Sequence, residues 1–203
     1  MATLCGYDYV FRAGAASPVL VMLHGTGDDA RSFARLADDL APAATVLSLQ
    51  GNVDEHGMAR FFRRRAMGVY DMADLAKRTE DMAAFLDEAV ALHGLQPSAL
   101  VGIGYSNGAN LLANLSFRRP AALRRLVLMH PLIPYVPQPA GTLAGLRVLV
   151  TAGRRDAIAP AATTDALIGH YAAAGACVER LDHDGGHELR PSELAAVGRF
   201  LAE

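Results

Sequence analysis

One stretch decides the fold of this chain: Leu100-Val101-Gly102-Ile103-Gly104-Tyr105-Ser106-Asn107-Gly108-Ala109-Asn110. An apolar run rich in β-forming residues leads directly into a Gly-Tyr-Ser-Asn-Gly turn, and a run compatible with a helix follows it. This order predicts a nucleophile elbow, in which a strand and a helix meet at a sharp turn with a strained Ser106 at its tip. Glycine is needed at positions 104 and 108 because a side chain there would collide with the neighbouring element. The alternative interpretation is a glycine-rich turn with an incidental serine.

The composition is typical of a globular protein. Of the 203 residues, 52% are apolar and 20% are charged, which allows a substantial core and gives no sign of disorder. The formal net charge of −2 does not indicate nucleic acid or an acidic membrane surface as a partner. We therefore expect a single domain over residues 1–203.

The sequence also bears on where the protein is located. No apolar run reaches the length of a membrane span, and residues 1–12 lack the pattern of a signal peptide. The two cysteines, Cys5 and Cys177, lie far apart and are expected to be buried, reduced thiols. These features predict a cytoplasmic protein without membrane insertion.

Strands and helices alternate along the chain. The predicted strands lie at 7–12, 19–24, 45–50, 99–105, 126–129, 146–152 and 177–181. The predicted helices cover 30–40, 71–92, 107–118, 160–174 and 192–202. Such alternation is typical of a doubly wound, mostly parallel α/β sheet with helices on both faces. The first strand is expected to be an antiparallel edge strand, segment 14–18 a turn, and segment 51–70 an irregular loop.

Three polar residues follow strands of this sheet, where ligands of open α/β sheets bind. Ser106 follows one strand, Asp156 follows the next-to-last strand, and His187 follows the last. A serine hydroxyl needs a base to take its proton, which His187 can supply while Asp156 fixes its tautomer. Taken singly, Asp156 is equally a helix cap and His187 a loop histidine. Taken together, and in this order, they predict a catalytic triad.

The segment 24–27, His-Gly-Thr-Gly, predicts an oxyanion hole. Its glycines let the backbone approach a substrate carbonyl, and the N–H of Thr26 can point at the oxygen. The N–H of Asn107, directly after the serine, is the second expected donor. His24 is expected to orient this loop.

These motifs resemble those of the phospholipase/carboxylesterase family of the α/β-hydrolase fold. The resemblance rests on segments 24–28, 104–108, 153–160 and 186–187 and spans essentially the whole chain. Segment 51–64 is similar to the small bacterial carboxylesterase branch rather than to the acyl-protein thioesterases. The resemblance implies an α/β-hydrolase fold without a large cap domain, and a serine esterase or thioesterase that acts on a small-molecule ester.

Other functions remain open at this point. A dienelactone-hydrolase-like or lysophospholipase activity fits the same fold, although the former needs a cysteine where Ser106 stands. A hydrolase-fold ligand sensor without activity is the alternative from a different class. No cluster has convincing metal-ligand spacing and no phosphate-binding loop is present, so neither a metal nor a cofactor is expected.

Substrate specificity is expected to come from segments 51–70 and 130–139, which border the predicted site. An arginine-rich run at 60–65 is either a solvated face or a binding site for a carboxylate on the substrate. The aromatic and aliphatic side chains either line an acyl groove or anchor the loops to the core. The candidate substrate-binding residues are Met58, Arg60, Phe61, Phe62, Arg64, Leu132 and Ile133.

The apolar-rich surface and the edge strand together predict a homodimer. Sedimentation at micromolar concentrations is expected to give a mass above the 21.5 kDa of one chain. A mass equal to one chain would contradict this expectation.

Overall fold

The computed structural model describes residues 1–203, except for the side chain of Ala16. Its main sheet contains β1 (Ala2–Leu4), β2 (Tyr7–Arg12), β3 (Ala16–Leu23), β4 (Ala44–Leu49), β9 (Leu100–Tyr105), β10 (Arg125–Met129), β11 (Arg147–Gly153) and β12 (Cys177–His183). The eight strands lie in the order β1-β2-β4-β3-β9-β10-β11-β12. Neighbouring strands from β4 to β12 in this order are parallel to each other. Strand β2 is antiparallel to both of its neighbours, β1 and β4. This is the mostly parallel α/β sheet that the sequence predicts.

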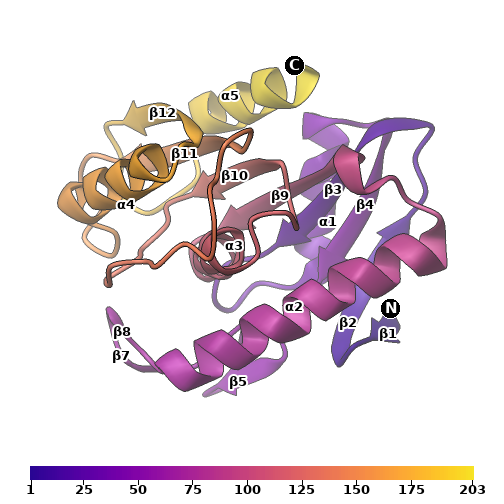
Figure 1. Cartoon of the computed structure of the whole chain (residues 1–203), viewed down its shortest axis with the longest axis horizontal. Coiled ribbons are helices and arrows are strands. Elements are labelled where there is room, and N and C mark those ends of the chain that lie inside the picture. The colour runs from indigo at the N-terminus through magenta and orange to yellow at the C-terminus, as the bar shows by residue number, and fades with distance from the viewer.

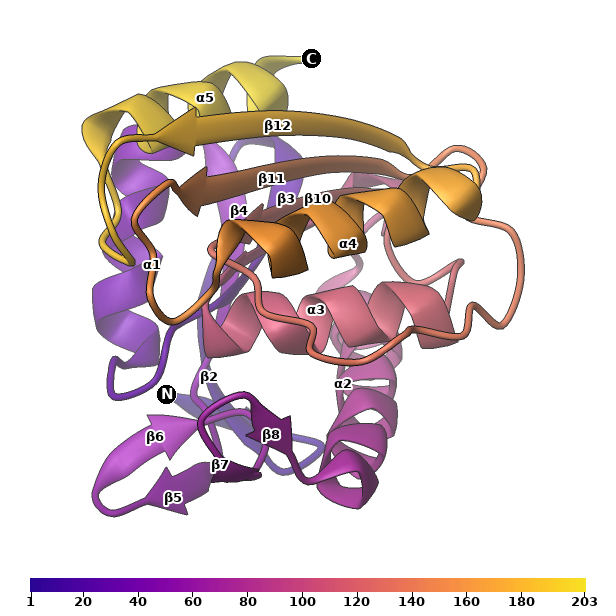
Figure 2. The same cartoon turned by 90° about the vertical axis from the view of Figure 1, so that its left-hand side faces the viewer.

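Helices cover both faces of the sheet (Figures 1 and 2). They are α1 (Ala30–Leu40), α2 (Met72–His93), α3 (Asn107–Arg118), α4 (Ala161–Ala173) and α5 (Pro191–Ala202), with one 3-10 turn, η1 (Pro97–Ala99). One core lies under α2, α3 and α4, and the other lies under α1 and α5. All five α-helices begin and end within one residue of their predicted bounds.

Strand β3 illustrates why the sheet is buried on both faces. Leu20 and Met22 enter the core beneath α1 and α5, while Val21 and Leu23 enter the core on the other side. Successive side chains of a strand point to opposite faces, so a strand covered twice is apolar at every position. The continuous apolar run in the sequence is therefore the signature of an inner strand.

The turn between β9 and α3 has the strained geometry that the sequence predicts. Ser106 has φ 49° and ψ −112°, a left-handed value that few residues other than glycine adopt. A Cβ atom on Gly108 would lie 2.2 Å from the carbonyl oxygen of Leu23, and one on Gly104 would lie 2.5 Å from the nitrogen of Ala109. Helix α3 thus packs against β3 and β9 at a distance that only glycine allows.

The segment from 51 to 70 differs from the predicted irregular loop. It forms two small antiparallel hairpins, β5 (Val53–Glu55) with β6 (Met58–Arg60) and β7 (Arg64–Ala66) with β8 (Val69–Tyr70). Each strand has only two or three residues, too few for the alternation of side chains to be recognised in the sequence. The hairpins lie beside the main sheet, at the lower part of Figure 2.

Three smaller expectations are also wrong. Strand β1 precedes β2 and takes the edge position, so β2 lies inside the sheet. Strand β3 already begins within the predicted turn, with a bulge before Val19. Cys5 is half-buried and Cys177 is exposed at the start of edge strand β12, so neither thiol is buried.

Among the described residues, no helix is long and apolar enough to cross a membrane.

The tight packing at the elbow generates a prediction about stability. Replacing Gly108 with Ala places a methyl group against the Leu23 backbone, which cannot move aside, and is expected to reduce the free energy of unfolding by about 3 kcal/mol. Gly198 in α5 is a matched control, because a Cβ there meets nothing within 4 Å. Gly198→Ala is expected to increase the free energy of unfolding, measured by urea titration, by about 0.5–1 kcal/mol. Equal stability of the two variants would contradict the close approach.

Candidate active site

The three residues predicted to form a triad lie together at the carboxyl ends of the strands. His187 Nε2 lies 2.8 Å from Ser106 Oγ, and His187 Nδ1 lies 2.6 Å from Asp156 Oδ2. Ser106 follows β9, Asp156 follows β11, and His187 lies in the loop after β12. The parallel strands end at one edge, which is why residues far apart in the sequence meet there.

The Asp156 carboxylate is fixed by four donors. Its Oδ1 accepts the N–H groups of Ile158 and Ala159 at 2.8 and 2.9 Å, and its Oδ2 faces the rings of His187 and His130. Burial opposes ionisation, but these hydrogen bonds lower the pKa of Asp156 below its usual range. Asp156 therefore also fixes the turn before α4, but it does not cap this helix, whose N-cap is Pro160.

The His187 loop is held by the residue that precedes the serine. The Tyr105 hydroxyl donates to the carbonyl oxygen of His187, and the two rings lie 5.6 Å apart. Burial and nearby carboxylates raise the pKa of Tyr105 to about 12, so its hydroxyl remains a donor. The histidine is thereby placed by a neighbour of the nucleophile itself.

The loop carrying Thr26 is anchored from two sides. The buried His24 donates from Nδ1 to the carbonyl of Gly25 at 2.6 Å and accepts the N–H of Gly51 at 3.0 Å. Burial lowers its pKa, in keeping with this neutral tautomer. The Arg60 guanidinium donates to Thr26 Oγ1 at 2.6 Å. His24 orients the loop, as predicted.

Asn107 begins α3, so its backbone N–H has no partner within the helix. Its side-chain Oδ1 accepts the N–H of Phe61 at 2.7 Å, which ties the hairpin segment to the helix. Thr26 and Asn107 line the same pocket as Ser106. Both residues are thus located where the oxyanion hole is expected.

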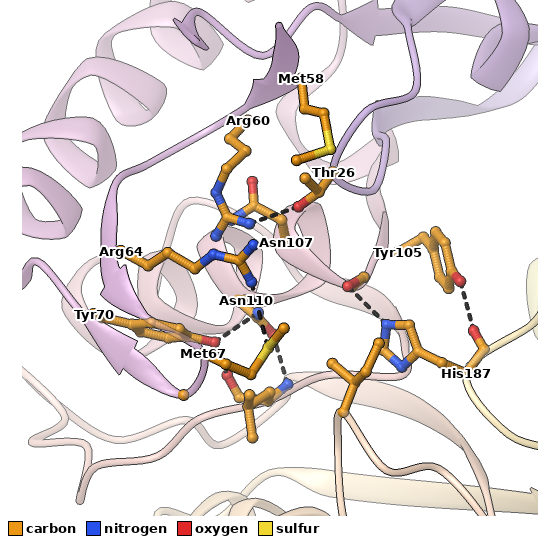
Figure 3. A pocket seen from close by; sticks show the side chains of 14 residues that line it. Thr26, Met58, Arg60, Arg64, Met67, Tyr70, Tyr105, Asn107, Asn110 and His187 are labelled. Carbon is orange, nitrogen blue, oxygen red and sulfur yellow. Dashed lines mark hydrogen bonds between the residues drawn. The ribbon is translucent and has the colours of Figure 1, made fainter. Parts of the chain in front are cut away.

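A pocket of about 230 Å³ opens in front of Ser106 (Figure 3). Its polar wall contains Arg60, Arg64, Tyr70 and Asn110, and the apolar residues Met58, Met67, Leu132 and Ile158 complete the lining. The wall is held together by Asn110, which donates to the Tyr70 hydroxyl at 2.8 Å and accepts the N–H of Leu132 at 2.6 Å. Asn110 thereby connects three segments of the chain that line this pocket.

Three of the candidate substrate-binding residues do not line it. Phe61 and Phe62 are fully buried, the first against the rings of Tyr7 and His24 and the second against Tyr70. Ile133 belongs to the core beneath α2, α3 and α4. The alternative that the aromatics anchor the loop is the correct one, because the chain turns inward after β6.

The arginine run divides into two groups. Arg60 and Arg64 line the pocket, with their guanidinium groups directed into it (Figure 3). Arg63 and Arg65 are exposed outside it. Glu55 accepts both Nε and Nη2 of Arg64, at 3.0 and 2.7 Å. Burial lowers the pKa of Arg60, but two guanidiniums still face one carboxylate, so this wall carries net positive charge.

Sequence reasoning missed a second layer behind the triad. His130, which follows β10, contacts Asp156 and Glu193, and His183 at the end of β12 contacts Glu193 as well. The position of His130 after a strand was a usable signal, because the same rule selected Ser106 and Asp156. Nothing comparable marked Glu193, which lies in the first turn of α5.

Among the described residues, these side chains also form the only groups of three or more His, Cys, Asp or Glu residues close enough together to bind a metal ion. His130 forms one such group with Asp156 and His187, and another with His183 and Glu193. Hydrogen bonds already pair the ring nitrogens with the carboxylates, so we assign no metal here.

Comparison with known proteins places this geometry in context. The family model described as serine aminopeptidase, S33, matches residues 14–147. The protein named "Putative hydrolase MhqD" of Bacillus subtilis (strain 168) is 35% identical over 195 residues, covering 96% of this chain and 98% of that protein. The solved carboxylesterase of Bacillus cereus is 38% identical with a TM-score of 0.93, over 97% of this chain and 93% of that chain. YahD, solved with malic acid, is 27% identical with a TM-score of 0.91, over 97% and 98% of the two chains.

The buried carboxylates generate a prediction about acid stability. Glu193 is buried, yet its hydrogen bonds from His130 and Thr151 lower its pKa. Its stabilisation is therefore present above the unfolded-state pKa of about 4.3 and is lost as the pH falls through the lower folded-state value. Glu193→Gln is expected to cost about 3 kcal/mol at pH 7.

This cost is expected to shrink below about pH 4, because the wild-type group then takes up its proton. Urea unfolding at several pH values measures it. Glu80→Gln, at an exposed pair with Arg119, is the control and is expected to cost less than about 1 kcal/mol throughout. A Glu193→Gln cost that is the same at pH 3 and pH 7 would refute the assignment of an ionised Glu193.

Proposed function

Because the chain belongs to the α/β-hydrolase family described as serine aminopeptidase, S33, and is an esterase-type hydrolase, we propose that it is a serine carboxylesterase with Ser106, His187 and Asp156 as its triad. The observation that carries this proposal is the unbroken line of hydrogen bonds from Ser106 through His187 to Asp156. Such a line lets a histidine take the serine proton while a carboxylate stabilises the imidazolium.

The proposed reaction has two stages. Ser106 Oγ attacks the ester carbonyl as His187 Nε2 takes its proton, and the N–H groups of Thr26 and Asn107 stabilise the oxyanion. His187 then returns the proton to the departing alcohol, which leaves an acyl-enzyme. A water molecule, deprotonated by His187, attacks the acyl carbonyl and releases the carboxylic acid and free Ser106. A thioester would follow the same course with a thiol as leaving group.

The pocket supports a small substrate. Its volume of about 230 Å³ suits a short acyl or alkyl group, and Met58, Leu132 and Ile158 supply apolar contacts. The similarity to a solved carboxylesterase favours an ester over the peptide that the family description suggests. We therefore assign small carboxylic esters as the substrate class.

The positive wall, formed by Arg60 and Arg64, supports a substrate that carries an anionic group. Arg64 uses Nε and Nη2 for Glu55, whereas its Nη1 contacts only the sulfur of Met67, a weak acceptor, at 3.4 Å. A carboxylate is a far better partner for that N–H group. The relative YahD was solved with malic acid, a small molecule with carboxylates.

The triad proposal makes a direct prediction. Ser106→Ala is expected to reduce kcat for p-nitrophenyl acetate or butyrate by at least about 10⁴-fold without changing thermal unfolding, because no other group can attack. A fluorophosphonate probe is expected to label the wild type at Ser106 and not to label the variant. Folded wild-type protein that fails to label would instead favour a ligand sensor without activity.

The positive wall makes a separate prediction. Arg64→Ala is expected to reduce kcat/KM about tenfold for an ester with a terminal carboxylate and to leave a neutral ester of equal length unchanged. The wild-type preference is expected to shrink with added salt. Arg63→Ala and Arg65→Ala remove the same charge outside the pocket and are the matched controls. Equal kcat/KM of the wild type for both esters would assign the run to a solvated face.

A further inference from the structure

The ring of His130 lies between two buried carboxylates behind the proposed triad. Its Nδ1 is 2.8 Å from Asp156 Oδ2, and its Nε2 is 3.0 Å from Glu193 Oε1. All three side chains have no exposed surface. His130 therefore contacts the same carboxylate oxygen, Asp156 Oδ2, that His187 contacts.

The hydrogen bonds around Glu193 show which atoms carry protons. Its Oε2 accepts the backbone N–H of Arg190 at 2.7 Å and faces His183 Nε2 at 3.0 Å. His183 Nδ1 accepts the N–H of Gly185 at 2.9 Å, so the proton of this ring is on Nε2. The other oxygen of Glu193, Oε1, accepts a hydrogen bond from the Thr151 hydroxyl at 2.6 Å. Glu193 is thus an acceptor at both oxygens and is ionised.

The same reasoning applies to Asp156, whose oxygens accept four donors. A ring that faces an ionised carboxylate at each nitrogen donates from both, and a histidine with two N–H groups is an imidazolium. Burial alone would favour the neutral ring, but the hydrogen bonds to Glu193 and Asp156 raise the pKa of His130.

The backbone holds this ring in place. His130 has φ 52°, a left-handed value that is uncommon for histidine, and its N–H donates to the carbonyl of Thr151 at 2.9 Å. The preceding residue, Met129, accepts the N–H of Ser106 at 2.9 Å. The strained turn after β10 thereby aims the ring at Asp156 and is tied to the nucleophile.

We propose that His130 is a positioning residue that stays protonated through the reaction, holds Asp156 in place and lowers the basicity of His187. This inference rests on the triad under "Proposed function". The two imidazole rings lie 5.1 Å apart, so a fixed positive charge on one disfavours protonation of the other. His187 then remains neutral, and able to act as a base, at a lower pH than Asp156 alone would allow.

Charged and titratable groups face this pair from four elements. Tyr105 on β9 lies against both rings, with centroids 5.9 Å from His130 and 5.6 Å from His187. Asp156 follows β11, His183 ends β12, and Glu193 belongs to α5. Two carboxylates and one imidazolium give this group a charge of −1 when His187 is neutral. The charge becomes zero when His187 takes the serine proton.

The first experiment observes the wild-type protein directly. Nitrogen-15 NMR of histidine-labelled protein, with His130→Asn used to assign its signals, is expected to show both His130 ring nitrogens protonated from pH 6 to 9. A His130 ring with one unprotonated nitrogen at pH 8 would overturn the proposal, whatever the activity of the enzyme.

The second experiment removes the charge and keeps a hydrogen bond. Asn tolerates left-handed backbone, and its amide can donate to Asp156 in place of Nδ1, so His130→Asn is the chosen variant. The acid limb of kcat/KM is expected to move up by about one to two pH units, because an imidazolium near 5 Å is lost. Activity well above the new limb is expected to stay within about tenfold of the wild type.

A matched control has the same substitution in the same backbone conformation. His56 has φ 55° in the exposed turn between β5 and β6, and His56→Asn is expected to leave the acid limb in place. An equal loss for His130→Asn at every pH, without a shift of the limb, would show a purely structural role and refute the proposal. Fluorophosphonate labelling of Ser106 in the wild type tests the triad separately, so failure of one proposal is distinguishable from failure of the other.

If His130→Asn does not fold, Glu193→Gln replaces it. A glutamine amide can donate to His130 Nε2, which lets that ring become neutral while Nδ1 still donates to Asp156. The acid limb is then expected to move up as well, and one His130 nitrogen is expected to lose its proton in the NMR spectrum. A variant in which His130 becomes neutral and the limb does not move would overturn the proposed effect on His187.

Discussion

The arrangement of this molecule depends on the close approach of α3 to strands β3 and β9. No Cβ fits at Gly104 or Gly108, and the helix is therefore pressed against the sheet at the point where the chain turns. This contact forces Ser106 into a left-handed backbone conformation and lifts its hydroxyl above the sheet edge. It also brings the first N–H of α3 beside the loop that follows β3. One steric constraint thus places both the proposed nucleophile and one of the proposed oxyanion donors.

Much of the fold was predictable because its signals are local and repeated. Runs of five to eight mostly apolar residues mark the inner strands. Some helices carry their own caps, such as Asp29, which accepts two backbone N–H groups at the start of α1. The candidate triad was predictable because parallel strands bring their carboxyl ends to one edge. That rule needs only the order of the strands and the residues that follow them.

The structure of the segment from 51 to 70, and the layer of side chains behind the candidate triad, were harder to predict from the sequence for a physical reason. Each hairpin strand is too short to show a pattern, and its two phenylalanines are buried through contacts with residues far away in the sequence, such as Tyr7. Glu193 is an ordinary glutamate in the first turn of a helix until β10, β11 and β12 bring His130, Thr151 and His183 to it. Buried ion pairs of this kind depend on tertiary contacts that no local pattern records.

The hairpin segment has a consequence for how the enzyme can diverge. It supplies Met58, Arg60, Arg64, Met67 and Tyr70 to the pocket lining. Its Arg60 side chain and its Phe61 backbone are also hydrogen-bonded to Thr26 and Asn107, which lie beside the proposed nucleophile. A change of substrate range through Arg60 would therefore also change the chemistry at the carbonyl. Positions such as Met58 and Met67 line the pocket without these hydrogen bonds to Thr26 and Asn107. Evolution or engineering has freedom at those positions, whereas Arg60 and Thr26 must vary together or not at all.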